Sequence, residues 1–127
     1  MTNQQITVVY KWTANEGKSE ELQAIYQEVT QQMEATEPNA MRVECYFDES
    51  TRTLVVYDLF ADNAALGLHL STTAVGHFPT LLQVATPGAF LFLGSVAEEL
   101  QQAAKGMGLD ATFAPSVFGF TREAASV

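Results

Sequence analysis

The chain contains 127 residues, of which 47% are hydrophobic and 17% charged, and its 15 acidic and 6 basic side chains give a formal charge of −9. A chain of this length forms one domain, residues 1–127, around one ordinary hydrophobic core. The few basic side chains are scattered along the chain, which argues against binding to nucleic acids or anionic membrane surfaces. The single cysteine, Cys45, excludes an intramolecular disulfide.

The sequence also lacks the features of export or membrane insertion. Its first five residues are polar and contain no apolar core of a signal peptide. No later stretch reaches the roughly 18 uninterrupted apolar residues of a membrane span. We therefore expect a soluble, cytoplasmic protein with no membrane partner.

The first half of the chain predicts a strand, a long helix and a hairpin. Residues 5–13 carry large apolar side chains at alternate positions, which is typical of a strand. Apolar residues then recur at three- and four-residue steps to about Glu37, which predicts a surface helix that Pro38 ends. Two runs, 41–48 and 53–60, are separated by four residues and predict an antiparallel hairpin. The second run is apolar on both faces, so we expect it to be buried on both sides.

The next segment predicts helical structure that is interrupted. Asp62 and Asn63 offer an N-cap for a helix of small and apolar residues. A Ser/Thr-rich break at 71–73 follows, and Pro79 is incompatible with one unbroken cylinder up to Val84. The pattern predicts two short helices joined near the break.

The C-terminal part predicts a strand, a helix and a last strand. Pro87 and Gly88 predict a turn before a strand over 89–94, again with large apolar side chains on both faces. The next helix is expected to begin with a capping box between Ser95 and Glu98.

The end of this helix and the last strand are also marked in the sequence. Gly106 is expected to supply a left-handed C-cap. A final extended strand over 112–121 follows, which Pro115 confines to a sheet edge or a bulge.

The predicted order β-α-β-β-α-β is that of the ferredoxin-like, α+β fold, with an added C-terminal helix and strand. Helices then cover one face of an antiparallel sheet, yet three strands are apolar on both faces. Two arrangements would cover the other face: the last helix crossing beneath the sheet, or a second copy packed sheet to sheet. We favour the second copy, which makes a homodimer of the dimeric α/β-barrel type.

Three short patterns within the first three-quarters of the chain are similar to those of a known family. The turn before the hairpin reads Glu-Pro-Asn-Ala, similar to a Glu-Pro-Gly-Cys motif with Asn39 in place of Gly. The end of the second hairpin strand resembles Glu-x-Trp-x-Asp, with Asp58 for Glu and Phe60 for Trp. A short helix ends at His69 before a Ser/Thr-rich step and a His-Phe pair that begins at His77. These patterns resemble the antibiotic biosynthesis monooxygenase-like family of the dimeric α/β-barrel superfamily.

The resemblance implies a homodimer that encloses a mostly apolar cavity. Some members of the family oxidise polycyclic phenols or quinols with O2 and use no metal or flavin, whereas others bind and degrade haem. The catalytic members use a set of Asn, Trp, Tyr or Arg residues, and no Asn-Trp pair can be placed here. Trp12 lies on the first strand, away from the strand-end Trp of the family, so a haem-degrading role is not favoured. The longer spacing between His69 and His77 implies a reshaped cavity mouth.

Oxygenation without a cofactor requires a base or hydrogen-bond acceptor in an apolar, water-poor pocket. His69, Asp58 and His77 are the candidate catalytic residues. Each has a plainer alternative: His69 as a half-exposed residue that closes its helix, His77 as a turn residue, and Asp58 as an acid paired across strands with Arg42 or Lys11.

A flat aromatic ligand would contact aromatic side chains on the strands and the short helices. The candidates are Tyr10, Trp12, Tyr57, Phe60 and Phe78, and the alternative is that they simply fill the core. Cys45 is expected to be a small buried hydrophobe. No metal site is expected, because the two histidines lie eight residues apart with no acidic partner at ligand spacing.

The sequence therefore predicts a small homodimeric protein that binds a small aromatic or quinone-like molecule in an apolar cavity and acts as a cofactor-independent monooxygenase. The alternative is a non-catalytic ligand-binding or assembly module of the same fold. A third possibility is a monomer whose last helix covers the open sheet face.

Overall fold

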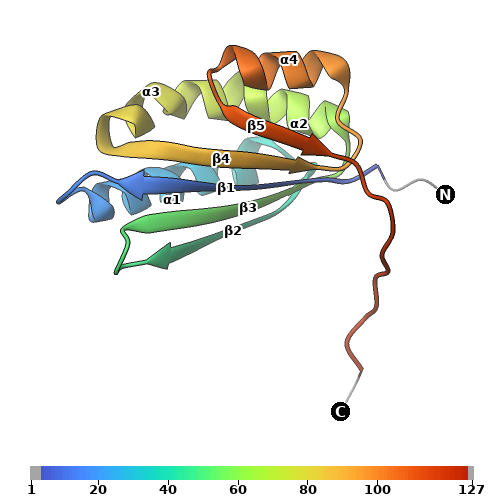
Figure 1. Cartoon of the computed structure of the whole chain (residues 1–127), viewed down its shortest axis with the longest axis horizontal. Coiled ribbons are helices and arrows are strands. Elements are labelled where there is room, and N and C mark those ends of the chain that lie inside the picture. Colours follow the sequence, from blue (N-terminus) through green and yellow to red (C-terminus); the bar gives the residue numbers. More distant parts are fainter. Residues whose placement is uncertain (1–3, 126–127) are drawn as a thin grey trace.

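The structure is a computed structural model that describes residues 4–125. In chain order the elements are β1 (Ile6–Ala14), α1 (Ser19–Thr36), β2 (Ala40–Asp48), β3 (Thr53–Phe60), α2 (Asn63–His69), the π-helix η1 (Leu70–Ala74), α3 (Val75–Val84), β4 (Ala85–Leu93), α4 (Glu98–Gly106) and β5 (Asp110–Ala114). Figure 1 shows the helices gathered on one side of a twisted sheet.

The sheet has five strands in the order β2-β3-β1-β4-β5. The first four are antiparallel neighbours, and β5 runs parallel to β4 at the edge. The prediction of an α+β ferredoxin-like fold with an added C-terminal helix and strand is confirmed. The antiparallel hairpin is confirmed as well, within one residue of its predicted bounds.

The core lies between this sheet and the helices. Ile6, Val8, Tyr10 and Trp12 alternate along β1 and are all buried, as the period-2 pattern of a half-buried strand requires. The buried residues of α1 recur along one side of the helix and cover the sheet. Burial of this apolar surface is the main stabilising contribution to the fold.

The helical run between β3 and β4 is interrupted differently from the prediction. Asp62 is the N-cap of α2, where its Oδ1 accepts a hydrogen bond from the Ala65 amide at 2.9 Å. The Ser/Thr-rich segment is the π-helix η1, so the chain remains helical from α2 through η1 to α3. Pro79 lies inside α3. Where the sequence predicted a break between two helices, the structure therefore has a continuous helical run with one wider π turn.

The prediction of a turn at Pro87 and Gly88 is wrong, because both residues lie within β4, which begins at Ala85. The pairing of β4 with β1 shifts register between Tyr10 and Trp12, opposite this segment. A bulge leaves a backbone group unpaired, which lets a strand accommodate a proline without an N–H group.

The predicted start and end of the last helix are wrong as well. The N-cap of α4 is Ala97, whose amide donates to the Asn63 side chain at 2.8 Å, so the cap comes from α2 and not from a local capping box. Gly106 is the last helical residue, and the left-handed conformation falls at Gly108, with φ 81°.

The final strand is shorter than predicted. It covers Asp110–Ala114, and Pro115 follows its last residue. Residues 115–125 form no helix or strand and are all exposed. Only the first part of the predicted 112–121 strand therefore joins the sheet.

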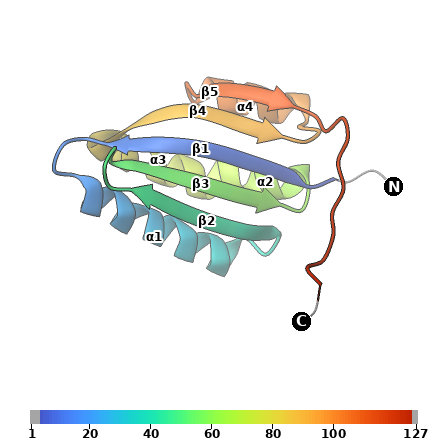
Figure 2. The same ribbon diagram turned by 60° about the horizontal axis from the view of Figure 1, so that its bottom comes forward.

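The sheet face without helices stays open in the single chain. α4 packs on the helical side, where Leu100 approaches Gly67 of α2, so the predicted alternative in which the last helix crosses beneath the sheet is wrong. Figure 2 looks onto the open face, whose paired positions include Val9, Tyr57 and Leu91. In the single chain, strands β3 and β4 are therefore buried on one side only, so the predicted burial on both sides is not provided by the chain itself.

Cys45 is exposed, which contradicts its predicted burial. It lies on β2, an edge strand, and its side chain lines a groove between β2 and α1 together with Phe47. Because β2 has only one neighbouring strand, the helical layer leaves its outer side uncovered.

Candidate functional site

A small cavity lies between the sheet and the helical run, with a volume of about 50 Å³. Its lining is predominantly apolar. The polar or ionisable side chains in the lining are Tyr10, Trp12, Tyr26, Asp58, His69, Thr73 and His77. Within residues 4–125 the lining includes no lysine or arginine. Polar groups in a small apolar cavity are the usual composition of a binding or active site.

Asp58 is the acidic group on the sheet side of this cavity. Its side chain points to the helical face of β3 and is 2% exposed. Oδ2 accepts a hydrogen bond from the Tyr10 hydroxyl at 3.0 Å, and Oδ1 has no partner in the described part of the chain. Burial raises the pKa of Asp58 to about 6, although the attraction of His69 and the hydrogen bond from Tyr10 act in the opposite direction. The alternative in which Asp58 pairs with Arg42 or Lys11 is therefore wrong.

A chain of hydrogen bonds leads to Asp58 from the aromatic side chains. The indole Nε1 of Trp12 donates to the Tyr26 hydroxyl at 3.0 Å, and that hydroxyl donates to the Tyr10 hydroxyl at 3.1 Å. Tyr10 then donates to Asp58. Every donor in this chain is aimed towards the carboxyl group, so the chain fixes the orientation of the aromatic side chains and of Asp58 together.

A second cluster lies around Glu37, which follows α1 and is 3% exposed. Its Oε2 is 3.2 Å from Nδ1 of His69 and accepts a hydrogen bond from the Thr73 hydroxyl at 2.5 Å. Burial acts to raise the pKa of Glu37, but the hydrogen bonds from His69 and Thr73 outweigh it and the pKa is lowered. An ionised carboxylate only accepts hydrogen bonds, so Nδ1 of His69 carries the hydrogen. In the neutral ring Nε2 is then the basic nitrogen.

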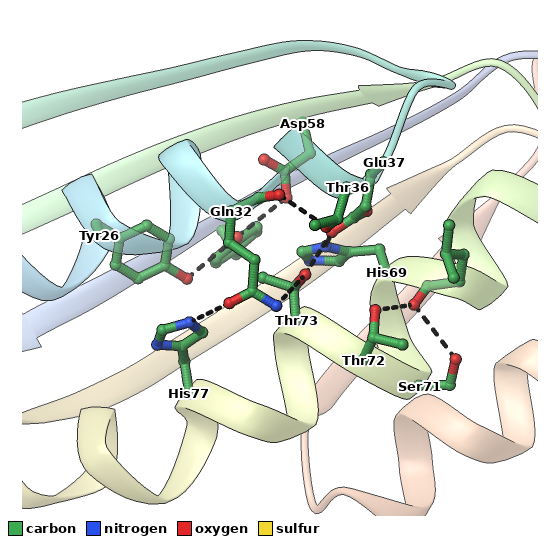
Figure 3. A network of polar contacts seen from close by, with 12 residues as sticks. Tyr26, Gln32, Thr36, Glu37, Asp58, His69, Ser71, Thr72, Thr73 and His77 are labelled. Carbon is green, nitrogen blue, oxygen red and sulfur yellow. Dashed lines mark hydrogen bonds and ion pairs between the residues drawn. The ribbon is translucent and has the colours of Figure 1, made fainter. Parts of the chain in front are cut away.

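The cluster extends through Gln32 of α1 to His77 of α3. Gln32 donates through Nε2 to the Thr73 hydroxyl at 3.2 Å, and its Oε1 lies 2.9 Å from Nε2 of His77. Figure 3 shows His69, Thr73 and His77 projecting from the helical run towards α1, where Gln32 and Glu37 meet them. The network thus joins two helices across the edge of the cavity.

The π-helix helps to align these three side chains. His69, Thr73 and His77 follow one another at four-residue intervals. In an α-helix with 3.6 residues per turn, positions four apart drift steadily around the axis. The wider π turn η1 contains an extra residue and so reverses part of this drift, which keeps the three side chains on the side facing α1.

The cavity brings together seven of the eight side chains that the sequence singled out as catalytic or ligand-binding. They are Tyr10, Trp12, Asp58, Phe60, His69, His77 and Phe78. His69 is buried, contrary to the alternative of a half-exposed residue, and His77 lies inside α3 rather than in a turn. Tyr57 points to the open sheet face, where the Arg42 guanidinium lies 5.1 Å from its ring centre. The functional roles of the seven stay predictions.

Four polar residues of the site were not among the predicted functional residues. Glu37 and Gln32 come from α1 or its end, Thr73 from η1 and Tyr26 from the buried side of α1. For Glu37 the sequence did contain a signal. This acidic residue stands directly before Pro38, between an apolar helix and an apolar strand, and an acidic side chain that is buried there needs a hydrogen-bond partner. For Gln32 there was no such signal. The apolar pattern of α1 places it next to the buried Met33 but does not indicate which side chains it contacts.

No candidate metal centre is found within residues 4–125, since no group of three or more His, Cys, Asp or Glu side chains is arranged to hold an ion. In the same part of the chain, no helix has both the length and the apolar character of a membrane span.

Solved structures share this fold at low sequence identity. MupZ from Pseudomonas fluorescens is 16% identical, with a TM-score of 0.78 over 96% of this chain and 92% of that protein. SnoaB, a cofactor-independent oxygenase from Streptomyces nogalater, is 16% identical, with a TM-score of 0.62 over 74% of this chain and 95% of its own. A protein from Shewanella oneidensis is 24% identical, with a TM-score of 0.60 over 71% and 87% of the two chains. At these identities the similarity demonstrates the fold.

The sequence itself connects the chain to a family. No curated protein sequence matches it. The family model for antibiotic biosynthesis monooxygenases, however, matches residues 5–80, which contain β1 to the first part of α3 and the Asp58, His69 and His77 side chains around the cavity. The predicted family resemblance is confirmed: the chain belongs to the antibiotic biosynthesis monooxygenase family.

Proposed function

We propose that this protein is a homodimeric, cofactor-independent monooxygenase that acts on a small, neutral aromatic molecule such as a phenol or quinol. The observation that carries the proposal is the pairing of an apolar cavity with two oriented bases, Asp58 and His69. Family membership and the fold shared with SnoaB support the reaction class.

The proposed chemistry begins with removal of a proton from the substrate hydroxyl. Oδ1 of Asp58 and Nε2 of His69 are the available acceptors, and a pKa near 6 makes Asp58 a stronger base than an ordinary carboxylate. The resulting anion is electron-rich and reduces O2. For a phenol, a ring C–H carbon becomes C=O with one oxygen atom of O2, and the hydroxyl carbon becomes the second C=O. The other oxygen atom leaves as water with the hydroxyl proton and the ring hydrogen, so that phenol and O2 give a quinone and one water molecule.

The charge of the cavity limits the substrate. Asp58 is part of its wall, Glu37 contacts His69 and Thr73 of that wall, and the described lining carries no lysine or arginine to hold a carboxylate or phosphate. A buried anion without a cationic partner is strongly disfavoured. The substrate is therefore uncharged on binding and becomes an anion only as its proton moves to a base of the site.

The size of the cavity also matters. About 50 Å³ has room for a few water molecules, whereas a cavity of about 150 Å³ is associated with benzene binding. A ring therefore enters only if side chains at the mouth move. His77 and Phe78 are half-buried on α3 and are the side chains best placed to do so.

The proposal is tested by following O2 consumption with a panel of neutral quinols and phenols. We expect uptake with at least one of them, a loss of about 100-fold or more in Asp58→Asn and in His69→Ala, and no change in the control Leu82→Ala on the exposed side of α3. Absence of uptake across the panel, or full activity in both site variants, overturns the proposal.

One observation favours a second candidate, a non-catalytic ligand-binding or assembly module. The cavity is small and is bordered by Trp12, Phe78, Phe90 and Phe92, as expected of aromatic side chains that fill a core. Binding of a quinol, measured by calorimetry, without consumption of O2 would favour this candidate.

The homodimer and the cytoplasmic location are part of the same proposal. The open sheet face carries apolar side chains that a second copy would cover, and a two-fold axis covers both copies at once. We expect light scattering to give a molecular mass of twice 13.8 kDa.

A further inference from the structure

The rim of the cavity is formed by two different parts of the chain. Most of the lining residues are buried, and the half-buried ones, which mark the rim, are Ala74, His77, Phe78, Met107 and Leu109. The first three belong to η1 and α3, whereas the last two lie in the turn between α4 and β5. This turn is on the helical side of the sheet, as Figure 1 shows. A ring that enters the cavity therefore passes between α3 and this turn.

The turn between α4 and β5 is held in place at both ends. The amide of Ala97, before α4, donates to the Asn63 side chain at 2.8 Å, and β5 pairs with β4 from Asp110 onwards. Ala111 lies opposite Phe90, a buried residue of the cavity wall. Because side chains alternate along a strand, Leu109 lies on the same face as Ala111. The two anchored ends thus present Met107 and Leu109 to the cavity.

Met107 is the adaptable side chain of this turn. It stands between Gly106 and Gly108, and a Cβ atom added at either glycine would meet no atom of another segment within 4 Å. Gly108 has a φ of 81°, a left-handed conformation that favours glycine. An unbranched thioether with three rotatable bonds fills irregular gaps and makes favourable contacts with aromatic ring edges. Met107 therefore has both the space and the flexibility to follow the outline of a bound ring.

The volume of the cavity limits how large that ring can be. About 50 Å³ is present, against about 150 Å³ for a cavity that binds benzene. The buried part of the lining is close-packed: the Phe90 ring centre lies 4.4 Å from that of Tyr10 and 6.5 Å from that of Trp12. Packed interiors resist a change of volume, so the extra room comes from the rim. Movement of a few rim side chains makes room for one ring and not for two fused rings.

The turn also lies outside the part of the chain that the family model matches. The match ends at residue 80 and includes the ionisable lining residues Asp58, His69 and His77. Met107 and Leu109 come later in the chain. The candidate bases and the adaptable wall are therefore supplied by separate parts of the sequence, so the wall can be altered without touching the bases.

We propose that Met107 sets the size of the ring that the cavity accepts, and that the substrate is a neutral phenol or quinol with a single ring. His77 and Phe78 open the way into the cavity, and Met107 closes on the bound ring from the opposite side of the rim. The proposal rests on the proposed function, because it concerns the same cavity. It is a statement about binding, however, and does not depend on the reaction with O2.

Isothermal titration calorimetry of the full chain with phenol and with 1-naphthol tests the proposal. We expect the wild type to bind phenol at least about 10-fold more tightly than 1-naphthol, and Met107→Ala to bind 1-naphthol about 10-fold more tightly than the wild type does. Met41→Ala makes the same change at a side chain that is 54% exposed on β2, outside the cavity, and should leave both dissociation constants unchanged. Circular dichroism verifies that the variants are folded.

A second variant decides the matter if Met107→Ala does not fold. Met107→Phe places a stiffer side chain at the rim and should weaken phenol binding by about 10-fold. Ring selectivity that stays unchanged in the folded variants overturns the proposal, and so does a wild type that prefers 1-naphthol or binds neither compound. O2 consumption with unchanged selectivity removes the role of Met107 and keeps the oxygenase. Shifted selectivity without O2 consumption keeps the role of Met107 and removes the oxygenase.

Discussion

Asp58 lines the cavity, Glu37 contacts two of its lining residues, and the surroundings of these two buried carboxyl groups act on them in opposite directions. Glu37 accepts hydrogen bonds from His69 and Thr73, and its pKa is lowered. Asp58 accepts a hydrogen bond from the Tyr10 hydroxyl, and burial raises its pKa to about 6. Two acidic groups with separated pKa values are a common way to divide tasks in an active site. Glu37 orients His69, and Asp58 is the group that we propose to exchange a proton.

The largest expected effect comes from removing the acceptor of the Glu37 cluster. Glu37→Ala leaves the Nδ1–H of His69 and the O–H of Thr73 buried without their acceptor, so we expect the free energy of unfolding at pH 7 to fall by about 3 kcal/mol. Urea denaturation measures it. Glu37→Gln is the matched control, because its amide oxygen keeps one of the two hydrogen bonds, and it should lose about 1 kcal/mol. Equal losses in the two variants would show that the carboxylate has no special role.

The pH dependence of this effect has a definite sign. The lowered pKa of Glu37 means that its contribution to stability is present above the ordinary value of 4.5 and is lost as the pH falls through the folded-state pKa. The difference between the wild-type chain and Glu37→Gln should therefore shrink in acid. A difference that grows below pH 4.5 would contradict the assigned direction.

The contribution of Asp58 to stability should change with pH in the opposite direction, and this effect is the second largest. Its folded-state pKa of about 6 lies above the ordinary 3.8, so between these values the unfolded chain releases a proton that the folded chain retains. Stability from this group is present below pH 3.8 and is lost as the pH rises to about 6, by an amount on the order of 3 kcal/mol. Asp58→Asn removes this loss and should be about 2 kcal/mol more stable than the wild type at pH 8.

The measurement for Asp58 is a series of thermal or urea unfolding curves from pH 4 to pH 8. The gain in Asp58→Asn should become small towards pH 4, because the wild-type carboxyl is protonated in both states only below the ordinary pKa of 3.8. Glu44→Gln, which removes an acidic charge from the open sheet face, is the control for net charge. If the control shows the same pH-dependent gain, the effect belongs to overall charge and not to the buried site.

Substitution of Thr73 tests the same cluster around Glu37, with a smaller expected effect. Thr73→Val keeps the shape of the side chain but removes the donor to Glu37 and the acceptor for Gln32, and should cost about 1.5 kcal/mol. Thr72→Val is its neighbour and control, because the Thr72 hydroxyl is exposed and bonds only to the Leu68 carbonyl. The control should stay within about 0.5 kcal/mol of the wild type. Similar losses at both positions would place the effect in the π turn and not in the network.

The strands and long helix were predictable because each carries its own periodicity. The alternation in β1 and the three- and four-residue steps in α1 are local patterns, and they also placed Asp58 on an apolar strand. The errors lie where a distant residue decides the local structure. Asn63 caps α4, and the register shift opposite Tyr10 and Trp12 lets Pro87 stay within a strand.

The candidate site divides in the same way. Aromatic residues and His69 stood out by type and position, whereas the partners Glu37, Gln32 and Thr73 are joined only by the packing of α1 against the helical run. Spacing in the sequence contains no record of a contact between residues 32 and 73. The extra residue of η1 is equally hidden, because a Ser/Thr-rich segment is compatible with a break, a loop or a π turn.

The smallest effect concerns the hydrogen bond that Asp58 receives from Tyr10. Tyr10→Phe keeps the ring stacked on Phe90 at 4.4 Å but removes the hydroxyl. Because that hydrogen bond favours the ionised carboxyl, its loss should raise the pKa of Asp58 above the wild-type value of about 6. Carbon-13 NMR titration of the aspartate carboxyl groups measures the midpoint, and Tyr57→Phe on the open face serves as control. A midpoint that falls in Tyr10→Phe would mean that water reaches Asp58 once the hydroxyl is gone, and that the contrast with Glu37 depends on the aromatic chain that shields it.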